Sequence, residues 1–209
     1  MSSFVSIEKA IQDLQQGKMI ILFDDESEQE GDLMIAAEKA TPQSINFMTQ
    51  YARGLVCLTL HETIVERLQI PSMPERNKLP GQAAFTVSIE AATGVTSGVS
   101  AFDRAHTIQV AIDPRSEPKD ISMPGHVFPI KARSGGVLER AGHTEASVDL
   151  TVLAGLKPAA VLCEIMQTDG RMAGLPELKL LATTHHLSLV AISDLVTYFK
   201  IHPKRSSCT

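Results

Sequence analysis

Carboxylate side chains are concentrated in one short stretch of the 209-residue chain, between Asp24 and Asp32. Six of the nine positions in DDESEQEGD are Asp or Glu, and none is Lys or Arg. Six like charges in one loop repel each other unless they are solvated, partly protonated or bound to a divalent cation. Glu28, Glu30 and Asp32 offer oxygen ligands of the type that Mg²⁺ accepts while it keeps several waters. Gly31 would allow a sharp turn before Asp32. A solvated acidic loop is the alternative, and the spacing does not match an EF-hand.

A basic residue, a histidine and a threonine occur together in RAGHTEA, from Arg140 to Ala146, just before a predicted helix. The first amides of a helix lack partners within the helix and lie at its positive dipole end. A phosphate there would be stabilised by backbone N–H groups, Thr144 and Arg140. His143 could bind a metal ion. The alternative is an ordinary capped helix start that contains a polar histidine.

Two further residues are candidates for proton transfer. His126 lies between Pro124 and Pro129 in PGHVFP, and we expect the prolines to hold it in a rigid turn. A histidine held in this way suits proton transfer near neutral pH. Glu164 ends the apolar run AAVLCE, where strands commonly present site residues. A loop histidine and a strand-end carboxylate without a function are the alternatives. Cys57 in GLVCL is more typical of a core residue than of a reactive thiol.

The elements that must position these residues are predicted from periodicity and from breaker residues. Predicted helices begin at the N-caps Ser6, Thr41 and Ser100, cover 145–153 and 176–185, and include a short one from Ser193. Predicted strands cover 19–23, 33–37, 55–60, 85–91, 159–165 and 188–192. Gly17 and Gly54 are expected to end the first two helices, and Asp103 to complete a capping box with Ser100. The region 114–136 is rich in Pro and Gly, so we expect it to lack long regular elements.

This irregular order of helices and strands predicts an α+β fold. We expect a single layered domain over residues 1–209, in which helices flank a mixed twisted sheet. The part from about 7 to 199 is expected to be well ordered and the C-terminal tail frayed.

Composition and charge narrow the possible functions. Nineteen Lys and Arg against 24 Asp and Glu give a formal net charge of −5, the wrong sign for a nucleic-acid-binding surface. The longest apolar runs are well below the ~20 residues that span a bilayer. The N-terminus lacks the pattern of a secretory signal, and three unpatterned cysteines indicate a reducing environment. The phosphate-binding patterns GxGxxG and GxxxxGK[ST] do not occur. We therefore expect a cytoplasmic protein with no nucleic-acid or membrane partner.

Several motifs, taken in their order along the chain, resemble the 3,4-dihydroxy-2-butanone 4-phosphate synthases of riboflavin biosynthesis. They are DDESEQEGDL, GLVCL, FTVSIEA, GVTSGVSAFDR, PGHVFP, GGVLERAGHTEA and AAVLCEI, and the resemblance extends roughly from Ile7 to Phe199. It implies a single-domain α+β lyase, usually a homodimer with active sites at the subunit interface. It also implies that the enzyme uses Mg²⁺ or Mn²⁺ to convert D-ribulose 5-phosphate to L-3,4-dihydroxy-2-butanone 4-phosphate and formate. Some members carry a fused GTP cyclohydrolase II domain, and we expect this chain to be too short for one.

The resemblance also implies roles for individual residues. Glu28 and His143 match the metal ligands, with Glu30 nearby in the same loop. His126 and Glu164 match the positions essential for catalysis. The substrate-contacting positions are matched by Glu28, Asp32, Arg140, Ala141, Gly142, His143, Thr144 and Glu164.

The acidic loop departs from the usual family pattern, which reads like DDEDRENEGD. Here DDESEQEGD is one residue shorter and has Ser27 where an arginine precedes the first metal-binding glutamate. That arginine binds substrate in the family, and a closed site without such a charge pair would bind its substrate more weakly by ~2 to 5 kcal/mol. The alternative to an active synthase is a weakened homologue that binds a sugar phosphate without turnover. A third possibility is an enzyme that prefers another pentose phosphate.

Overall fold

The computed structural model of the chain describes residues 4–74 and 82–202, so the predicted frayed tail lies outside the described residues. The strands are β1 (Ile20–Phe23), β2 (Gly31–Ala36), β3 (Arg53–Leu60), β4 (Ala84–Phe85), β5 (Ile89–Ala91), β6 (Ile121–Lys131), β7 (Ala159–Ile165) and β8 (Ser188–Ala191). The α-helices are α1 (Ile7–Gln15), α2 (Pro42–Phe47), α3 (Glu62–Arg67), α4 (Ala101–Ile112), α5 (His143–Leu153), α6 (Leu175–His185) and α7 (Ile192–Ile201). In the part of the chain that the structure covers, no helix has the length and apolar character needed to cross a membrane.

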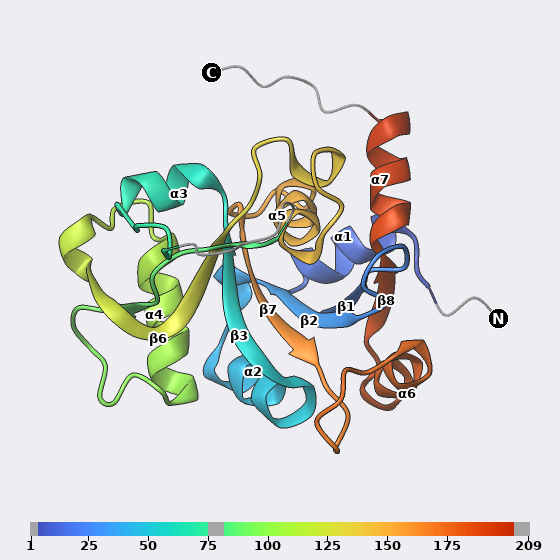
Figure 1. Cartoon of the computed structure of the whole chain (residues 1–209), viewed down its shortest axis with the longest axis horizontal. Coiled ribbons are helices and arrows are strands. Elements are labelled where there is room, and N and C mark those ends of the chain that lie inside the picture. Colours follow the sequence, from blue (N-terminus) through green and yellow to red (C-terminus); the bar gives the residue numbers. More distant parts are fainter. Residues whose placement is uncertain (1–3, 75–81, 203–209) are drawn as a thin grey trace.

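The strands form one mixed sheet in the order β4-β6-β3-β7-β2-β1-β8, and β5 pairs with β6 beside this path. Strand β3 is parallel to β6 and antiparallel to β7, and β7 is also antiparallel to β2. The C-terminal end of β7 therefore lies beside the N-terminal ends of β2 and β3. This is the edge at which the candidate site is built. The predicted α+β class, a mixed sheet flanked by helices, is confirmed (Figure 1).

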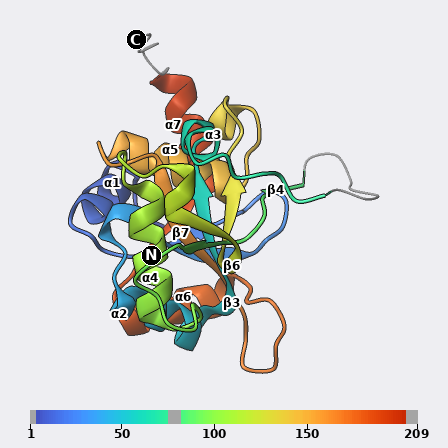
Figure 2. The same ribbon diagram turned by 90° about the vertical axis from the view of Figure 1, so that its left-hand side faces the viewer.

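Helices cover both faces of the sheet because successive strand residues point to opposite sides. Ile21 and Leu33 pack in a core shared with α2, α4 and α6. Their neighbours Ile20 and Met34 pack with α1, α5 and α7. Figure 1 shows α5 and α7 above the strands and α2 and α6 below them, and Figure 2 shows α4 beside β6. All six residues of β2 are buried, as expected of a strand covered on both faces.

The capping residues Ser6, Thr41 and Ser100 correctly predicted the starts of three of the seven described α-helices. The Ser6 hydroxyl accepts the N–H of Lys9 and begins α1, and Thr41 forms a reciprocal capping box that opens α2. The end of the second helix was predicted wrongly at Gly54. A π-helical turn, Met48–Ala52, continues α2, and Arg53 ends it with φ 71°. Gly54 already belongs to β3, where a Cβ would lie 2.3 Å from the backbone oxygen of Glu164.

The expectation that 114–136 lacks a long element is wrong, because β6 covers eleven residues of it. Ser122 and Val127 pair with the consecutive residues Glu90 and Ile89, so four residues of β6 bulge out of the ladder. Pro124 and His126 lie in this bulge. A proline lacks the N–H that a regular ladder needs, and a bulge tolerates it. His126 is therefore held in a bulge within a strand rather than in a turn between elements.

Two other boundaries differ from the prediction. The single strand predicted over 85–91 is divided into β4 and β5. Strand β4 pairs with Ile130 and Lys131 of β6, whereas the pairing of β5 begins at Val127 and includes the irregular stretch. The last helix, α7, is ten residues long and begins at Ile192 instead of Ser193. The backbone N–H and hydroxyl of Ser193 donate to the carboxylate of Asp25, which ties the acidic loop to α7.

Candidate active site

One cavity of about 460 Å³ brings together most of the residues that the sequence marks for chemistry. It lies where the acidic loop, the end of β7 and the start of α5 meet. The predicted residues that line it are Glu28, Asp32, Arg140, His143, Thr144 and Glu164. Glu30 also lines it, together with Leu55, Cys57, Ala83, Phe85, Ile130 and Leu162. Ala141 and Gly142 belong to the same turn before α5 but do not line the cavity.

The acidic loop is held from its first residue. The carboxylate of Asp24 accepts the backbone N–H groups of Glu26, Ser27 and Glu28 at 3.1, 2.9 and 3.2 Å. The chain reverses at Gln29, which has φ 57°, so the predicted sharp turn is not at Gly31. Gly31 begins β2 instead. A glycine fits this position because a Cβ there would lie 2.6 Å from the Leu178 side chain. The loop thereby presents Glu28 and Glu30 to the cavity.

The carboxylates of Asp32 and Glu164 line the cavity from neighbouring strands. Asp32 on β2 pairs in register with Glu164 on β7, and Asp32 is only 6% exposed. Burial raises the pKa of Asp32 to about 6, and although His143 opposes the shift, the nearby charges of Glu164, Glu28 and Glu30 add to it. Burial, followed by repulsion from Glu28, also raises the pKa of Glu30. The site therefore concentrates negative charge that a cation would neutralise.

Glu164 is oriented by the backbone of β3. Its Oε2 accepts the N–H of Leu55 at 2.9 Å. A Cβ on Gly54 would lie 2.7 Å from that same oxygen, so a glycine is required for this close approach. One oxygen of the carboxylate is thus fixed by β3.

The basic side of the cavity is built around the start of α5. This helix begins at His143 with Gly142 as N-cap, two residues before the predicted start. Arg140 Nη1 lies 2.7 Å from Oε2 of the buried Glu145, which holds the guanidinium in place. A Cβ on Gly142 would lie 2.3 Å from Arg140 Nη1, so the guanidinium packs directly on the glycine. A cationic side chain and free helix amides converge here, as the sequence predicted for an anion site.

The side chains at the cavity fit a divalent cation that keeps most of its water. Glu28 Oε2 lies 3.7 Å from His143 Nδ1, too far for a hydrogen bond. Glu28 and His143 are thus neighbours that would hold one divalent cation, and a carboxylate oxygen and an imidazole nitrogen are donor types that such cations accept. The other ring nitrogen, Nε2, is buried and has no hydrogen-bond partner among the described residues, so no contact there holds the imidazole in another role. Within residues 4–74 and 82–202, no three His, Cys, Asp or Glu side chains converge on a metal position. A pair of ligands is nevertheless typical of Mg²⁺ sites completed by water and substrate.

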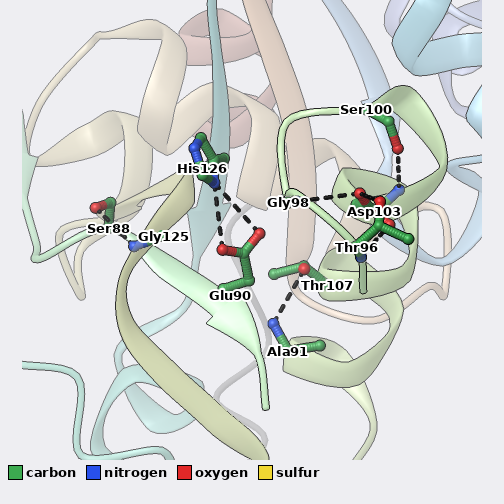
Figure 3. A network of polar contacts seen from close by, with 10 residues as sticks. All are labelled: Ser88, Glu90, Ala91, Thr96, Gly98, Ser100, Asp103, Thr107, Gly125 and His126. Carbon is green, nitrogen blue, oxygen red and sulfur yellow. Dashed lines mark hydrogen bonds and ion pairs between the residues drawn. The ribbon is translucent and has the colours of Figure 1, made fainter. Parts of the chain in front are cut away.

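His126 does not line the cavity of its own chain. Its Nδ1 instead lies 3.2 Å from Glu90 Oε2 on β5, and its side chain is 46% exposed (Figure 3). The structure therefore separates His126 from the other predicted catalytic residue, Glu164, within the described chain.

The apolar wall of the cavity was not predicted from the sequence. Leu55 and Cys57 are two positions apart on β3, so their side chains lie on the same face of the sheet. This spacing is a sequence signal that could have identified them. Cys57 is buried, as predicted for a core residue, yet it also lines the cavity. Burial, with the nearby Glu164, raises the pKa of its thiol above the usual range. Phe85 and Ile130 come from paired positions of β4 and β6 and carry no local signal.

Comparison with known proteins relates the chain to one family. Residues 8–198 match the family model for 3,4-dihydroxy-2-butanone 4-phosphate synthase. The chain is 54% identical over 198 residues to the riboflavin biosynthesis protein RibBA of Aquifex aeolicus, an alignment that covers 93% of this chain and 49% of that protein. It is 52% identical over 199 residues to the 3,4-dihydroxy-2-butanone 4-phosphate synthase of Neisseria meningitidis serogroup A, covering 95% of this chain and 55% of the relative. The chain thus spans about half the length of these curated relatives.

A solved structure is similar over its whole length. It is a 3,4-dihydroxy-2-butanone 4-phosphate synthase in complex with two magnesium ions, 36% identical to this chain, with a TM-score of 0.89. The alignment covers 97% of this chain and 100% of that one. On these matches, the chain belongs to the 3,4-dihydroxy-2-butanone 4-phosphate synthase family.

Proposed function

We propose that this chain is a 3,4-dihydroxy-2-butanone 4-phosphate synthase domain. It acts as a lyase that converts D-ribulose 5-phosphate to L-3,4-dihydroxy-2-butanone 4-phosphate and formate in riboflavin biosynthesis. The observation that carries the proposal is that Asp32 and Glu164, Glu28 and His143, and Arg140 and Thr144 at the start of α5 all line one cavity. Family membership supports the same reaction.

The basic side of the cavity suits the phosphate of the substrate. The ion pair with Glu145 already orders the Arg140 side chain. Binding an anion therefore costs little additional side-chain entropy. The hydroxyl of Thr144 and the first amides of α5 are further donors to a phosphate. With the phosphate at this end, the sugar carbons extend toward Asp32 and Glu164.

The acidic side suits the proton transfers. A base must remove a proton beside the ketose carbonyl, and the later dehydration and loss of formate need further transfers. Glu164, oriented by the Leu55 amide, and Asp32 opposite it are the carboxylates that face the sugar. Glu28 and His143 would hold Mg²⁺ or Mn²⁺. When bound, the cation supplies positive charge that stabilises the negative charge developing on substrate oxygens.

His126 supplies the remaining proton transfer from a second copy of the chain. Its exposed position outside the cavity of its own chain supports this arrangement, because a proton-transfer group must come within hydrogen-bond reach of the substrate. Phe102 and Met123, which lie on the neighbouring elements α4 and β6, are exposed apolar side chains suited to a subunit contact. A homodimer with active sites at the interface accounts for both observations.

The test is formate release from D-ribulose 5-phosphate, measured with Mg²⁺ and with EDTA. Wild type should release formate and the butanone phosphate only with the cation, Glu164→Ala should be inactive, and Glu117→Ala, in an exposed ion pair with Lys119, should match wild type. Turnover in Glu164→Ala would contradict the assigned site.

A variant with an arginine inserted after Ser27 decides between the active enzyme and the weakened homologue. Similar turnover with and without the insertion would show that the short acidic loop is compatible with catalysis. If wild type releases no formate and the insertion restores release, the weakened homologue is favoured. A panel of pentose phosphates would reveal a changed substrate preference.

A further inference from the structure

His126 and Glu90 form a close pair outside the cavity. Nδ1 of His126 lies 3.3 and 3.2 Å from the two carboxylate oxygens of Glu90 (Figure 3). The carboxylate accepts, so the proton of the pair lies on Nδ1. That leaves Nε2 as the nitrogen through which His126 can exchange a proton with a bound molecule.

The backbone is shaped to make this contact. In the bulge of β6, the N–H of Gly125 donates to the Ser88 hydroxyl at 3.2 Å. A Cβ on Gly125 would lie 2.2 Å from the backbone of Ile89, so only glycine permits the two strands to approach this closely. The next residue along β6 is His126, and the next along β5 is Glu90. The close approach of the strands thus brings the two side chains together.

Glu90 is itself held from two sides. The N–H of Ala91 donates to the Thr107 hydroxyl on α4, which fixes the end of β5. Gly98, with φ +82°, packs against the Glu90 carboxylate, and a Cβ there would lie only 1.6 Å from Oε1.

Gly98 is fixed in turn by Asp103. Its N–H donates to the Asp103 carboxylate, as do the N–H and hydroxyl of Thr96. These hydrogen bonds hold the pKa of Asp103 below its usual range, and the bond from the Thr96 hydroxyl has the largest effect. The Asp103 carboxylate therefore holds the loop of Thr96 and Gly98 against Glu90. Only half of the predicted capping box forms: the Ser100 hydroxyl accepts the Asp103 N–H, while the Asp103 side chain binds the loop. The Glu90 side chain is only 17% exposed as a result, far less than that of its partner.

We propose that Glu90 is a positioning residue for His126. It fixes the tautomer and the ring orientation of the imidazole, so that Nε2 is the nitrogen that faces the substrate. A carboxylate that binds the second nitrogen of a functional histidine has this effect in catalytic triads and in metal sites. The inference rests on the proposed role of His126 in proton transfer.

Kinetics on the 209-residue chain test the role. Glu90→Ala should lower kcat by about 10- to 100-fold with KM within about twofold. Glu90→Gln, which keeps a hydrogen-bond acceptor, should recover part of that loss. In the His126→Ala background, Glu90→Ala should have little further effect, because Glu90 acts only through His126. Equal losses in both backgrounds, or a raised KM with kcat unchanged, would overturn the proposal. Glu117→Ala is the matched control for removal of a carboxylate.

Nitrogen-15 NMR of histidine-labelled protein tests the tautomer without any activity. The chain has seven histidines, so the His126 signals are identified by their absence from the His126→Ala spectrum. At about pH 8, where ordinary histidines are neutral, wild type should carry the proton on Nδ1 and Glu90→Ala should not. An unchanged tautomer in Glu90→Ala would contradict the proposal. Absence of formate release by wild type would instead contradict the proposed function, while the spectra still decide the pairing.

Discussion

Asp32 and Glu164 lie directly opposite each other on the antiparallel strands β2 and β7, and both line the same cavity. Two carboxylates in this position repel each other, and Asp32 is almost completely buried. Their arrangement therefore works against the stability of the folded chain. Functional sites commonly have this property, because the groups that the reaction needs are not those that packing prefers.

The contribution of Asp32 to the stability of the metal-free protein should become less favourable as the pH rises from about 4 to about 6. The pKa of Asp32 is raised from near 3.8 to about 6 in the fold. The folded state therefore binds the proton more tightly than the unfolded state, and ionisation above the folded pKa favours unfolding. Asp32→Asn removes this charge and should increase the free energy of unfolding at about pH 7.5 by about 1 to 3 kcal/mol. Urea unfolding in EDTA measures it. The gain should shrink at about pH 5; Glu66→Gln, at an exposed position on α3, is the control, and no gain at the higher pH would contradict the expectation.

Mg²⁺ should stabilise the folded chain through Glu28 and His143. A ligand that binds only the folded state adds about 2.7 kcal/mol when its concentration is 100 times Kd. We expect the rise in Tm to be greater at neutral pH than at about pH 5, because protons compete with a metal ion for its ligands. Thermal unfolding with and without Mg²⁺ measures this shift. Glu28→Gln and His143→Ala should each lose most of it, and a full shift in both variants would place the ion elsewhere.

Gly142→Ala should displace Arg140. The new Cβ would lie 2.3 Å from the guanidinium, so Arg140 must leave its place beside Glu145. We expect KM for the phosphorylated substrate to rise by about tenfold or more, as when a charge pair with the substrate is removed. Steady-state kinetics measure this change. Gly174→Ala is the matched control, because its Cβ makes only an ordinary contact at 3.4 Å, and an equal effect there would argue against the guanidinium as the cause.

Mixed dimers should show whether His126 acts across a subunit interface. His126→Ala and Glu164→Ala should each keep no more than a small residual activity alone. After denaturation and refolding of an equal mixture, half of the dimers pair one variant with the other. Each such dimer has one intact site if His126 serves the partner's cavity, so activity should return to about a quarter of wild type. No activity in the mixture, with dimers confirmed by sedimentation, would mean that both residues act within one chain.

The sequence predicted those elements whose signals are local. Ser6 and Thr41 mark helix starts through hydrogen bonds to residues three positions away, and the apolar run 159–165 is β7 without change. The bulge in β6 could not be predicted, because it exists only through the pairing of β6 with β5. The role of Gly54 was predicted wrongly for the same reason, since this glycine is required by Glu164 from a distant strand.

In the candidate site, too, residues with local signals could be predicted and residues that meet through distant contacts could not. The residues of the acidic loop and of the α5 start were identified because each group is contiguous in the chain. Apart from Leu55 and Cys57, which alternation along β3 places on one face, the apolar wall of the cavity depends on strand pairing that the sequence does not display. The contact of His126 with Glu90 joins positions 36 residues apart. The roles assigned to His126, Glu164 and the metal ligands remain predictions that the variants above address.

Cys57 has a consequence for how the cavity tolerates oxidants and electrophiles. The thiolate is the form of cysteine that reacts with peroxides and alkylating agents. Burial and the neighbouring carboxylates keep the Cys57 thiol protonated, and the same holds for the buried Cys163 on the adjacent strand. Oxidation and alkylation of this cavity should therefore be slow, although it contains sulfur. Compounds designed to occupy it would gain little from a group that reacts with thiols.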